Sequence, residues 1–131
     1  MIFGIGTDLV SQPRIVAAVQ RYGDRFLRRI LTERELTDLA ARPRNDAQFI
    51  RFVAQRFAAK EAFSKALGTG MRQGVGWRDA GVHNEAGGRP LLHVSTAMRA
   101  RLASLDIEGM HVSLSDEVEL TVAVVMLEKR T

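Results

Sequence analysis

The sequence predicts an α+β fold, and three observations support this prediction. The opening residues, MIFGIGTDLV, alternate apolar residues with glycine, as in a strand that another element approaches closely. The segment 12–67 carries helix caps and apolar residues at helical spacing. The remainder contains two pairs of strand-like segments, each pair separated by turn residues, and one further helix. From the length we expect a single domain spanning residues 1–131.

Start and stop signals delimit the elements of the first half. Ser11 can cap a helix that has Pro13 in its first turn, and Gly23 ends that helix. Thr32 and Glu35 match a capping box, in which the glutamate reaches back to the start of its helix. We therefore expect a strand at about 2–6 and helices at about 12–22, 24–31, 33–41 and 47–67, the last stopped by Gly68.

The second half begins with a glycine-rich loop, GTGMRQGVG. We expect strands at 77–85 and 90–95 joined by AGG, a helix at 96–105 capped by Ser95 or Thr96, and strands at 111–115 and 120–128 joined across Asp116 and Glu117. The last strand, LTVAVVMLE, is almost wholly apolar, so both of its faces should be covered. Either a second subunit or a central position in the chain's own sheet would cover it.

Composition and charge exclude several classes of site. There is no cysteine, which excludes disulfides, thiolate zinc sites and cysteine nucleophiles. No leader pattern and no apolar run near membrane-spanning length is present, so we expect a cytoplasmic protein. Of the 16 arginines, ten lie in 12–56 together with only five acidic residues, a local net charge of +5. Nucleic acid, an acidic protein or a nucleotide would each suit this half of the chain.

The longest helix contains the stretch FAAKEAFSKALGTG, which admits two interpretations. The helical spacing places the apolar residues on one stripe: Phe49, Phe52, Ala59, Ala62, Phe63, Ala66 and Leu67. Glu61 and Lys65 lie roughly opposite, four residues apart, beside Ala54 and Ala58. They are either a surface ion pair or part of an anion or metal site. The flanking alanines leave a shallow face for another element or a ligand, and the glycine-rich loop can turn its N–H groups toward an anion.

Asp8 supports the metal interpretation. It follows the glycine-containing strand, where metal carboxylates are common, although a turn or cap role is an equal alternative. One aspartate and one glutamate make a poor cage for Ca²⁺. They suit Mg²⁺, which keeps several waters and completes its shell with substrate phosphates.

These residues carry a family resemblance. The segments GIGTDLV, RFAAKEAFSKALGTG and HVSLSDE followed by TVAVVMLE resemble, in order and along the whole chain, the small bacterial type of the 4′-phosphopantetheinyl transferase superfamily, the holo-acyl-carrier-protein synthases. The resemblance implies a homotrimer with active sites between subunits. It implies transfer of 4′-phosphopantetheine from coenzyme A to a serine of apo-acyl carrier protein, with release of adenosine 3′,5′-bisphosphate, for fatty acid biosynthesis.

The resemblance also implies roles for particular residues. Asp8 and Glu61 match the family's Mg²⁺ ligands, and Lys65 matches a lysine near the coenzyme A phosphates. The remaining matches are Gly68, Thr69, Gly70 and Pro90, which line the cofactor, and Arg14, Arg21, Arg25 and Arg28, which receive the acidic carrier protein. In this mechanism Lys65 supplies a charge or a proton to the leaving phosphate, and either Glu61 or a metal-bound water accepts the serine proton.

One departure from the family concerns histidine. Many members have Ser-His where this chain has Ser115 and Asp116, so no histidine is available at 116. His111 heads a strand and is a candidate cofactor contact or a structural strand-end residue. His83 and His93 lie within hairpin strands and are expected to be structural.

Two other functions compete with the transferase. A small nucleic-acid-binding module fits the basic charge, but it needs exposed aromatic residues among the arginines. Phe49, Phe52 and Phe63 instead follow the core stripe. A non-catalytic interaction protein with the same fold has no chemical reason to keep Asp8 and Glu61 convergent.

Overall fold

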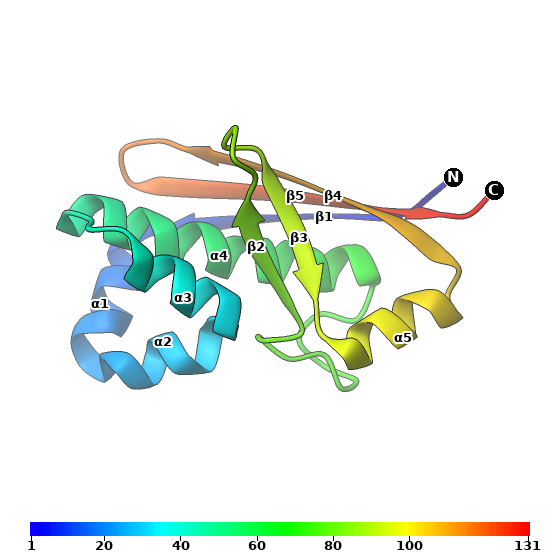
Figure 1. The fold of residues 1–131 in the computed structure, drawn as a ribbon, viewed down its shortest axis with the longest axis horizontal. Helices are drawn as coiled ribbons and strands as arrows, with labels where there is room; N and C mark the ends of the chain where they lie inside the picture. The colour runs from blue at the N-terminus through cyan, green and yellow to red at the C-terminus, as the bar shows by residue number, and fades with distance from the viewer.

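The computed structural model describes residues 1–131 and confirms the α+β class. Ten elements follow one another: β1 (Ile2–Ser11), α1 (Gln12–Tyr22), α2 (Asp24–Ile30), α3 (Glu33–Ala41), α4 (Asp46–Leu67), β2 (Ala80–Asn84), β3 (Pro90–Val94), α5 (Thr96–Ser104), β4 (Ile107–Asp116) and β5 (Leu120–Lys129). Helix α4 runs along the three-stranded sheet, and α1, α2 and α3 gather around its N-terminal half (Figure 1). None of the helices combines the length and the apolar character needed to span a membrane.

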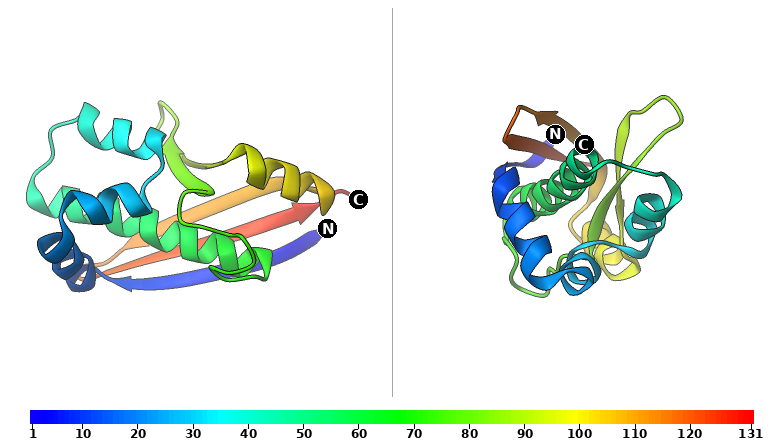
Figure 2. Two further views of the ribbon diagram at one scale, coloured as in Figure 1. Left: turned by 90° about the horizontal axis from the view of Figure 1, so that it is seen from below. Right: turned by 90° about the vertical axis from the view of Figure 1, so that its left-hand side faces the viewer.

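The strands form two antiparallel sheets. The larger one has the order β1-β5-β4, and β2 pairs with β3 as a separate hairpin. In the turned view the larger sheet lies on one side of α4 and α5 lies near the chain termini (Figure 2). Both termini lie at the same end of the sheet, where the N-terminal amine donates to the Lys129 carbonyl at 3.0 Å.

Local signals set most boundaries as predicted. Thr32 and Glu35 form the full capping box of α3, and Ser95 caps α5 by accepting from the Met98 N–H. Gly68 ends α4 in the left-handed conformation, with φ of 91°, as a C-terminal glycine should. The strand predicted at 2–6 is longer, because β5 pairs with β1 as far as Ser11. Asp8 therefore lies inside this strand and not beyond it.

The apolar strand β5 is the central strand of one chain's own sheet. Its inward residues Thr121, Ala123, Val125 and Leu127 are fully buried. Its outward residues, such as Val124, are only partly covered. Ile5 and Leu9 on the neighbouring strand are 57% and 60% exposed. The central position thus accounts for one face of the strand, and the other face remains an exposed apolar surface.

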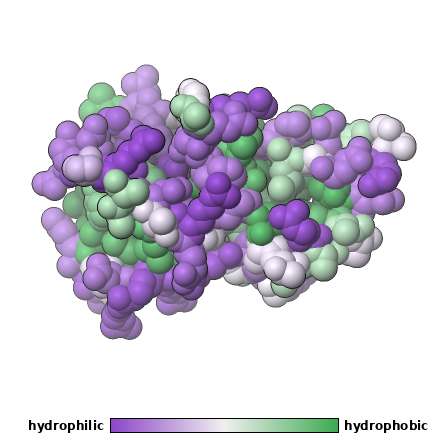
Figure 3. Space-filling view, in the orientation of Figure 1, coloured by the Kyte–Doolittle hydropathy of each residue, from purple (hydrophilic) through white to green (hydrophobic).

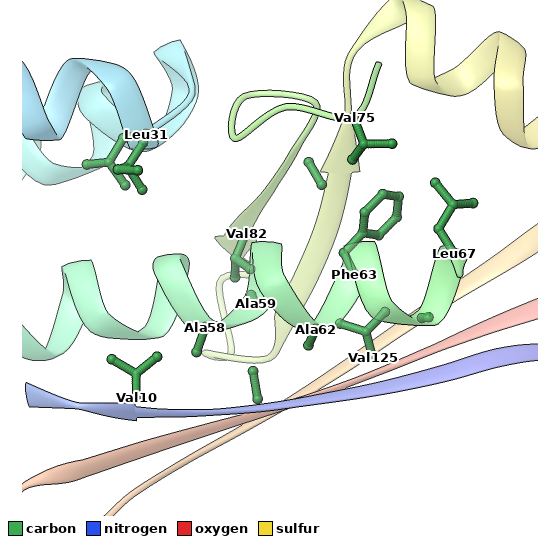
Figure 4. Packing of buried hydrophobic residues seen from close by; sticks show 14 of the residues in the cluster. Val10, Leu31, Ala58, Ala59, Ala62, Phe63, Leu67, Val75, Val82 and Val125 are labelled. Carbon is green, nitrogen blue, oxygen red and sulfur yellow. The ribbon is translucent and has the colours of Figure 1, made fainter. Parts of the chain in front are cut away.

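Helix α4 is buried on two sides, and the residues on these two sides differ in size. Small residues, including Ala58 and Ala62, face the sheet, whereas Phe63 and Leu67 point toward the hairpin side (Figure 4). The shallow alanine face predicted from the sequence is therefore covered by strands. Residues Gly4 and Gly6 permit the close approach: a Cβ on Gly6 would lie 1.9 Å from the Ala62 carbonyl oxygen.

A buried ion pair, not expected from the sequence, holds α4 to α3 and the hairpin. Lys60 Nζ lies 2.5 Å from Glu35 Oε1, and both side chains are at most 1% exposed. Lys60 also donates to the Ala80 carbonyl at 2.7 Å, and Glu35 Oε2 accepts from the Val82 N–H at 2.8 Å. Each charge has polar partners, which offsets part of the desolvation cost.

Both hairpin histidines join this network, as their expected structural role requires. His93 Nε2 lies 2.9 Å from Thr32 Oγ1, and its Nδ1 lies 3.3 Å from His83 Nδ1. Burial lowers the pKa of His93 to about 4, and the nearby Glu35 only partly opposes this shift. Burial also lowers the pKa of His83. The fold therefore favours neutral imidazoles at both positions.

The glycine contact gives a prediction for Gly6→Ala. The added methyl group would overlap backbone atoms of α4, so we expect a loss of about 3 kcal/mol or more in the free energy of unfolding. Urea unfolding measures this loss. Gly87→Ala is the control, because a Cβ at that position would have no atom within 4 Å; it should change stability by less than about 0.5 kcal/mol. Equal effects of the two substitutions would show that β1 and α4 are not in close contact.

The depressed pKa of His93 predicts acid destabilisation. Between its ordinary value near 6.5 and its folded value of about 4, the unfolded chain binds a proton that the folded chain does not. The free energy of unfolding should therefore be fully present above pH 6.5 and should fall as pH is lowered through this window. Urea titrations at pH 7, 6 and 5 test this, and His93→Gln should flatten the slope. An unchanged slope in that variant would exclude His93 as its source.

Candidate active site and family

Strand β1 and helix α4 bring Asp8, Glu61 and Lys65 together. Asp8 alternates onto the same face of β1 as Gly4 and Gly6, which face α4. Lys65 Nζ lies 3.3 Å from Asp8 Oδ1 and donates to the Thr7 carbonyl at 3.0 Å. The Lys65 side chain is half exposed, whereas that of Asp8 is mostly covered. The sequence-predicted cluster therefore forms within a single chain.

This cluster carries an excess of negative charge. Burial raises the pKa of Glu61, and the negative charge of Asp8 raises it further, while Lys65 and Arg14 oppose the change. Asp8 Oδ2 is buried and has no hydrogen-bond partner. The two carboxylates thus have one ammonium in contact and the Arg14 charge nearby without an ion pair, and one carboxylate oxygen is buried without a hydrogen-bond partner. Such an arrangement attracts a further cation.

The donor set fits Mg²⁺ better than a metal that needs a protein cage. No group of three or more His, Cys, Asp or Glu side chains that could hold a metal occurs in the chain. Two carboxylates with a free oxygen on Asp8 leave most of the coordination shell to water and substrate oxygens. The residues present fit a magnesium ion that is shared with a phosphate substrate.

The first three N–H groups of the glycine-rich loop turn back to the end of helix α4 and are not available to an anion. The N–H groups of Gly68, Thr69 and Gly70 all donate to the Ser64 carbonyl, at 3.1, 3.2 and 3.1 Å. They satisfy the last turn of α4, which would otherwise leave carbonyl groups unpaired. Any cofactor contact of this loop must use other atoms.

Pro90 and His111 lie apart from Asp8 in one chain. Pro90 starts β3 and pairs with Asn84 near the turn of the hairpin. His111 pairs with Met126, so it lies on the outer face of the larger sheet, and Asp8 lies on the inner face. Its Nε2 is 2.6 Å from Glu128 Oε1. The structure of one chain does not unite these residues with the carboxylates.

Asp116 has a defined contact role. Its Oδ2 accepts from Gln55 Nε2 and its Oδ1 accepts from Thr121 Oγ1, both at 2.7 Å. These bonds fix the end of β4 to α4 and to the neighbouring strand. Asp116 is therefore a link between sheet and helix.

Sequence reasoning missed an arginine-rich cavity of about 510 Å³ beside the N-terminal half of α4. Arg56 is only 3% exposed; it donates to Gln55 Oε1 and Asn84 Oδ1, while its Nε has no partner. Burial lowers its pKa to about 10. The other arginines on the wall are Arg42, Arg44 and Arg51. The arginine density signalled an acidic partner, but the spacing did not show that these four side chains converge.

The predicted partner arginines lie on two consecutive helices and are exposed. Arg14 and Arg21 belong to α1, and Arg25 and Arg28 belong to α2; all four are exposed. None makes an ion pair within the chain. Hydrophilic side chains cover much of the end of the molecule where α1, α2 and α3 lie (Figure 3). These cations are free to meet an acidic partner.

An aromatic stack that the sequence did not reveal adjoins this surface. The Phe57 ring stacks on Trp77 with centroids 4.8 Å apart, and Phe26 lies 6.4 Å from Phe57. The stack lines a cavity of about 410 Å³ together with Arg25 and Arg29. The surface thus combines a partly apolar floor with cationic walls. Phe52 and Phe63, by contrast, are core residues as predicted, and Phe49 packs partly buried against the core.

Comparison with known proteins points to one family. Residues 4–123 match the 4′-phosphopantetheinyl transferase superfamily. A holo-[acyl-carrier-protein] synthase of Rhodopseudomonas palustris strain HaA2 is 47% identical over 131 residues, covering 97% of this chain and 93% of the relative. The crystal structure of the Neisseria meningitidis holo-[acyl-carrier-protein] synthase superposes with a TM-score of 0.91 at 40% identity, covering 98% of this chain and all of that chain.

A further structural relative was solved with its ligand. The holo-(acyl-carrier-protein) synthase of Bacillus anthracis, in complex with CoA (3′,5′-ADP), has a TM-score of 0.81 at 38% identity and covers 99% of each chain. The chain therefore belongs to the 4′-phosphopantetheinyl transferase superfamily, a class of enzymes. Its particular family within that class is that of the holo-[acyl-carrier-protein] synthases, which confirms the resemblance seen in the sequence.

Proposed function

We propose that this enzyme transfers 4′-phosphopantetheine from coenzyme A to a serine of apo-acyl carrier protein. The serine oxygen forms a bond to the pantetheine-bearing phosphorus while the pyrophosphate P–O bond breaks, so adenosine 3′,5′-bisphosphate leaves. The observation that carries the proposal is the convergence of Asp8, Glu61 and Lys65, with Asp8 Oδ2 buried and unpaired. The coenzyme A complex of the Bacillus anthracis relative supports the choice of donor.

The residues of the cluster divide the chemistry between them. Asp8 and Glu61 would hold Mg²⁺, which supplies positive charge to the phosphate oxygens when bound. Lys65 is half exposed at the edge of the cluster, so its ammonium can reach a phosphate and stabilise the charge that develops on the leaving group. Either the Glu61 carboxylate or a metal-bound water would accept the serine proton. Positioning and charge stabilisation carry most of such a transfer.

The carrier protein would dock on the surface formed by Arg14, Arg21, Arg25 and Arg28. Acyl carrier proteins are strongly acidic, and these arginines are exposed and unpaired. Complementary charge of this kind accelerates encounter and sets the register of the complex. The aromatic stack beside Arg25 would add an apolar contact at the same place.

A homotrimer with active sites between subunits would unite the remaining residues. The outer face of the sheet exposes Ile5 and Leu9, an apolar surface that a second copy would cover. Pro90 and His111 lie away from Asp8 in one chain, but a neighbouring copy can bring its own Pro90 or His111 to the cofactor. The loop Gly68–Gly70 would then contact coenzyme A through atoms other than its three occupied N–H groups.

The metal assignment predicts the behaviour of Asp8→Asn and Glu61→Gln. Each substitution keeps the size of the side chain but removes a charged ligand, so kcat should fall at least about 100-fold. The mass gain of an apo-carrier protein by one phosphopantetheine group measures the rate. Chelator should stop the wild-type reaction and Mg²⁺ should restore it. Glu108→Gln, at an exposed side chain whose ion pair is with Arg130, is the control and should be fully active. Turnover that resists chelator would contradict a metal at Asp8.

The docking surface predicts a selective defect when Arg14 and Arg21 are both changed to Glu. Reversed charges should raise KM for the carrier protein more than about tenfold and leave KM for coenzyme A nearly unchanged. The wild-type rate should also fall with added salt, because the Debye length is only about 8–10 Å at moderate ionic strength. Arg99→Glu, on α5 and exposed, serves as the control. A parallel rise of both KM values would assign the two arginines to the nucleotide or to the fold.

A further inference from the structure

The ammonium group of Lys65 occupies the place at which a cation is needed. It lies 3.3 Å from Asp8 Oδ1 and 3.0 Å from the Thr7 carbonyl oxygen, so it contacts the carboxylate from the open side of the cluster. Glu61 lies one helical turn before Lys65, and the ammonium charge acts on that carboxylate also. Lys65 therefore compensates both acids in the protein without a bound metal.

This compensation is incomplete. Asp8 and Glu61 carry two negative charges; besides the Lys65 ammonium, only Arg14 acts on Glu61, and Arg14 forms no ion pair with either carboxylate. Asp8 Oδ2 stays buried without a partner. No hydrogen bond or ion pair of the Glu61 carboxylate is found within the chain. A divalent ion would balance both carboxylates and use the free oxygen. The ammonium and a divalent ion repel each other when they lie within a few ångströms, so a metal at Asp8 favours departure of the ammonium.

We propose that the Lys65 ammonium occupies the cation position beside Asp8 only while no metal is bound. A divalent metal displaces the ammonium from Asp8, and the displaced side chain becomes available for the phosphates of the donor. This inference rests on the proposed function, because it takes Asp8 and Glu61 as the metal site. The lysine can leave at small cost, since its side chain is 51% exposed and exposed ion pairs contribute little stability. Metal binding at Asp8 would thus free the Lys65 ammonium to contact the phosphates of the donor.

The proposal gives Lys65→Met two effects of opposite direction. Transfer should slow at least tenfold in kcat/KM, because a charge near the leaving phosphate is lost. Metal binding should become tighter, because the metal no longer competes with an ammonium. A lysine that only contacts phosphate would give the first effect without the second, and a lysine that helps to hold the metal would weaken binding.

Mn²⁺ binding to the free protein, followed by the electron paramagnetic resonance signal of unbound Mn²⁺, tests the exchange without any turnover. Lys65→Met should lower the Kd for Mn²⁺ at least threefold. Lys129→Met, the same chemical change at an exposed lysine with no ion pair, should leave Kd unchanged. An equal or higher Kd in Lys65→Met overturns the proposal. If Asp8→Asn binds Mn²⁺ as tightly as the wild type, the metal is not at Asp8, and the metal site of the proposed function fails together with the exchange.

A second measurement reports the displaced side chain itself. The chain has three lysines, of which Lys60 is buried and Lys129 is exposed, so amine acetylation followed by peptide mass spectrometry resolves each one. Saturating Mg²⁺ should raise the acetylation rate of Lys65 at least twofold relative to that of Lys129. In Asp8→Asn the rate should be high from the start and insensitive to Mg²⁺. A Lys65 rate that Mg²⁺ leaves unchanged in the wild type overturns the proposal.

Discussion

The close contact between β1 and α4 is the constraint on which the site depends. A Cβ on Gly4 would lie 2.0 Å from the Ala66 carbonyl oxygen, and one on Gly6 would lie 1.9 Å from that of Ala62. The strand and the helix therefore run in opposite directions, with two strand residues spanning about one helical turn. Asp8, the next residue on the same face of the strand, must then lie beside the turn that contains Glu61. The approach of Asp8 to the helix that carries Glu61 therefore depends on the absence of side chains at Gly4 and Gly6.

A second contact fixes the rotation of α4 about its own axis. The pair formed by Lys60 and Glu35 is buried on the side that faces α3 and the hairpin, and it is bonded to backbone groups of β2. A buried pair of this kind is costly to break, because either partner alone would be an unpaired charge in the interior. Glu61 is the next residue, about 100° further around the helix. Holding Lys60 inward consequently holds Glu61 toward the edge of β1, where Asp8 lies.

Most helix boundaries could be predicted because they depend on residues close in sequence. Strand lengths and the burial of charged residues could not, because they depend on contacts between distant parts of the chain. The capping box at Thr32 and the glycine stop at Gly68 depend on neighbours within four residues, so the sequence shows them directly. The pairing of β1 as far as Ser11 depends on β5, which lies more than a hundred residues away in sequence. Burial of Lys60 was not predictable from its helix alone, because its partner Glu35 belongs to another helix. Asp8 and Glu61 could be proposed as metal ligands from the sequence, because one aspartate and one glutamate without further ligands suit few metals other than Mg²⁺.

The same distinction explains which parts of the site the sequence left open or did not show. A glycine-rich loop after a helix can direct its N–H groups either outward to an anion or back to the helix, and composition does not separate these outcomes. Here the Ser64 carbonyl takes all three N–H groups. Arg56 illustrates the converse case: its charge is visible in the sequence, yet only the packing of Phe52 against its guanidinium and the contact with Asn84 show that it is buried and fixed. Among the arginines of α1 and α2, Arg21 lies over the Tyr22 ring, but Arg14, Arg21, Arg25 and Arg28 are all exposed and form no ion pair within the chain. One basic segment thus contains two kinds of arginine, and tertiary contacts decide which arginines shape a cavity and which remain free to meet another molecule.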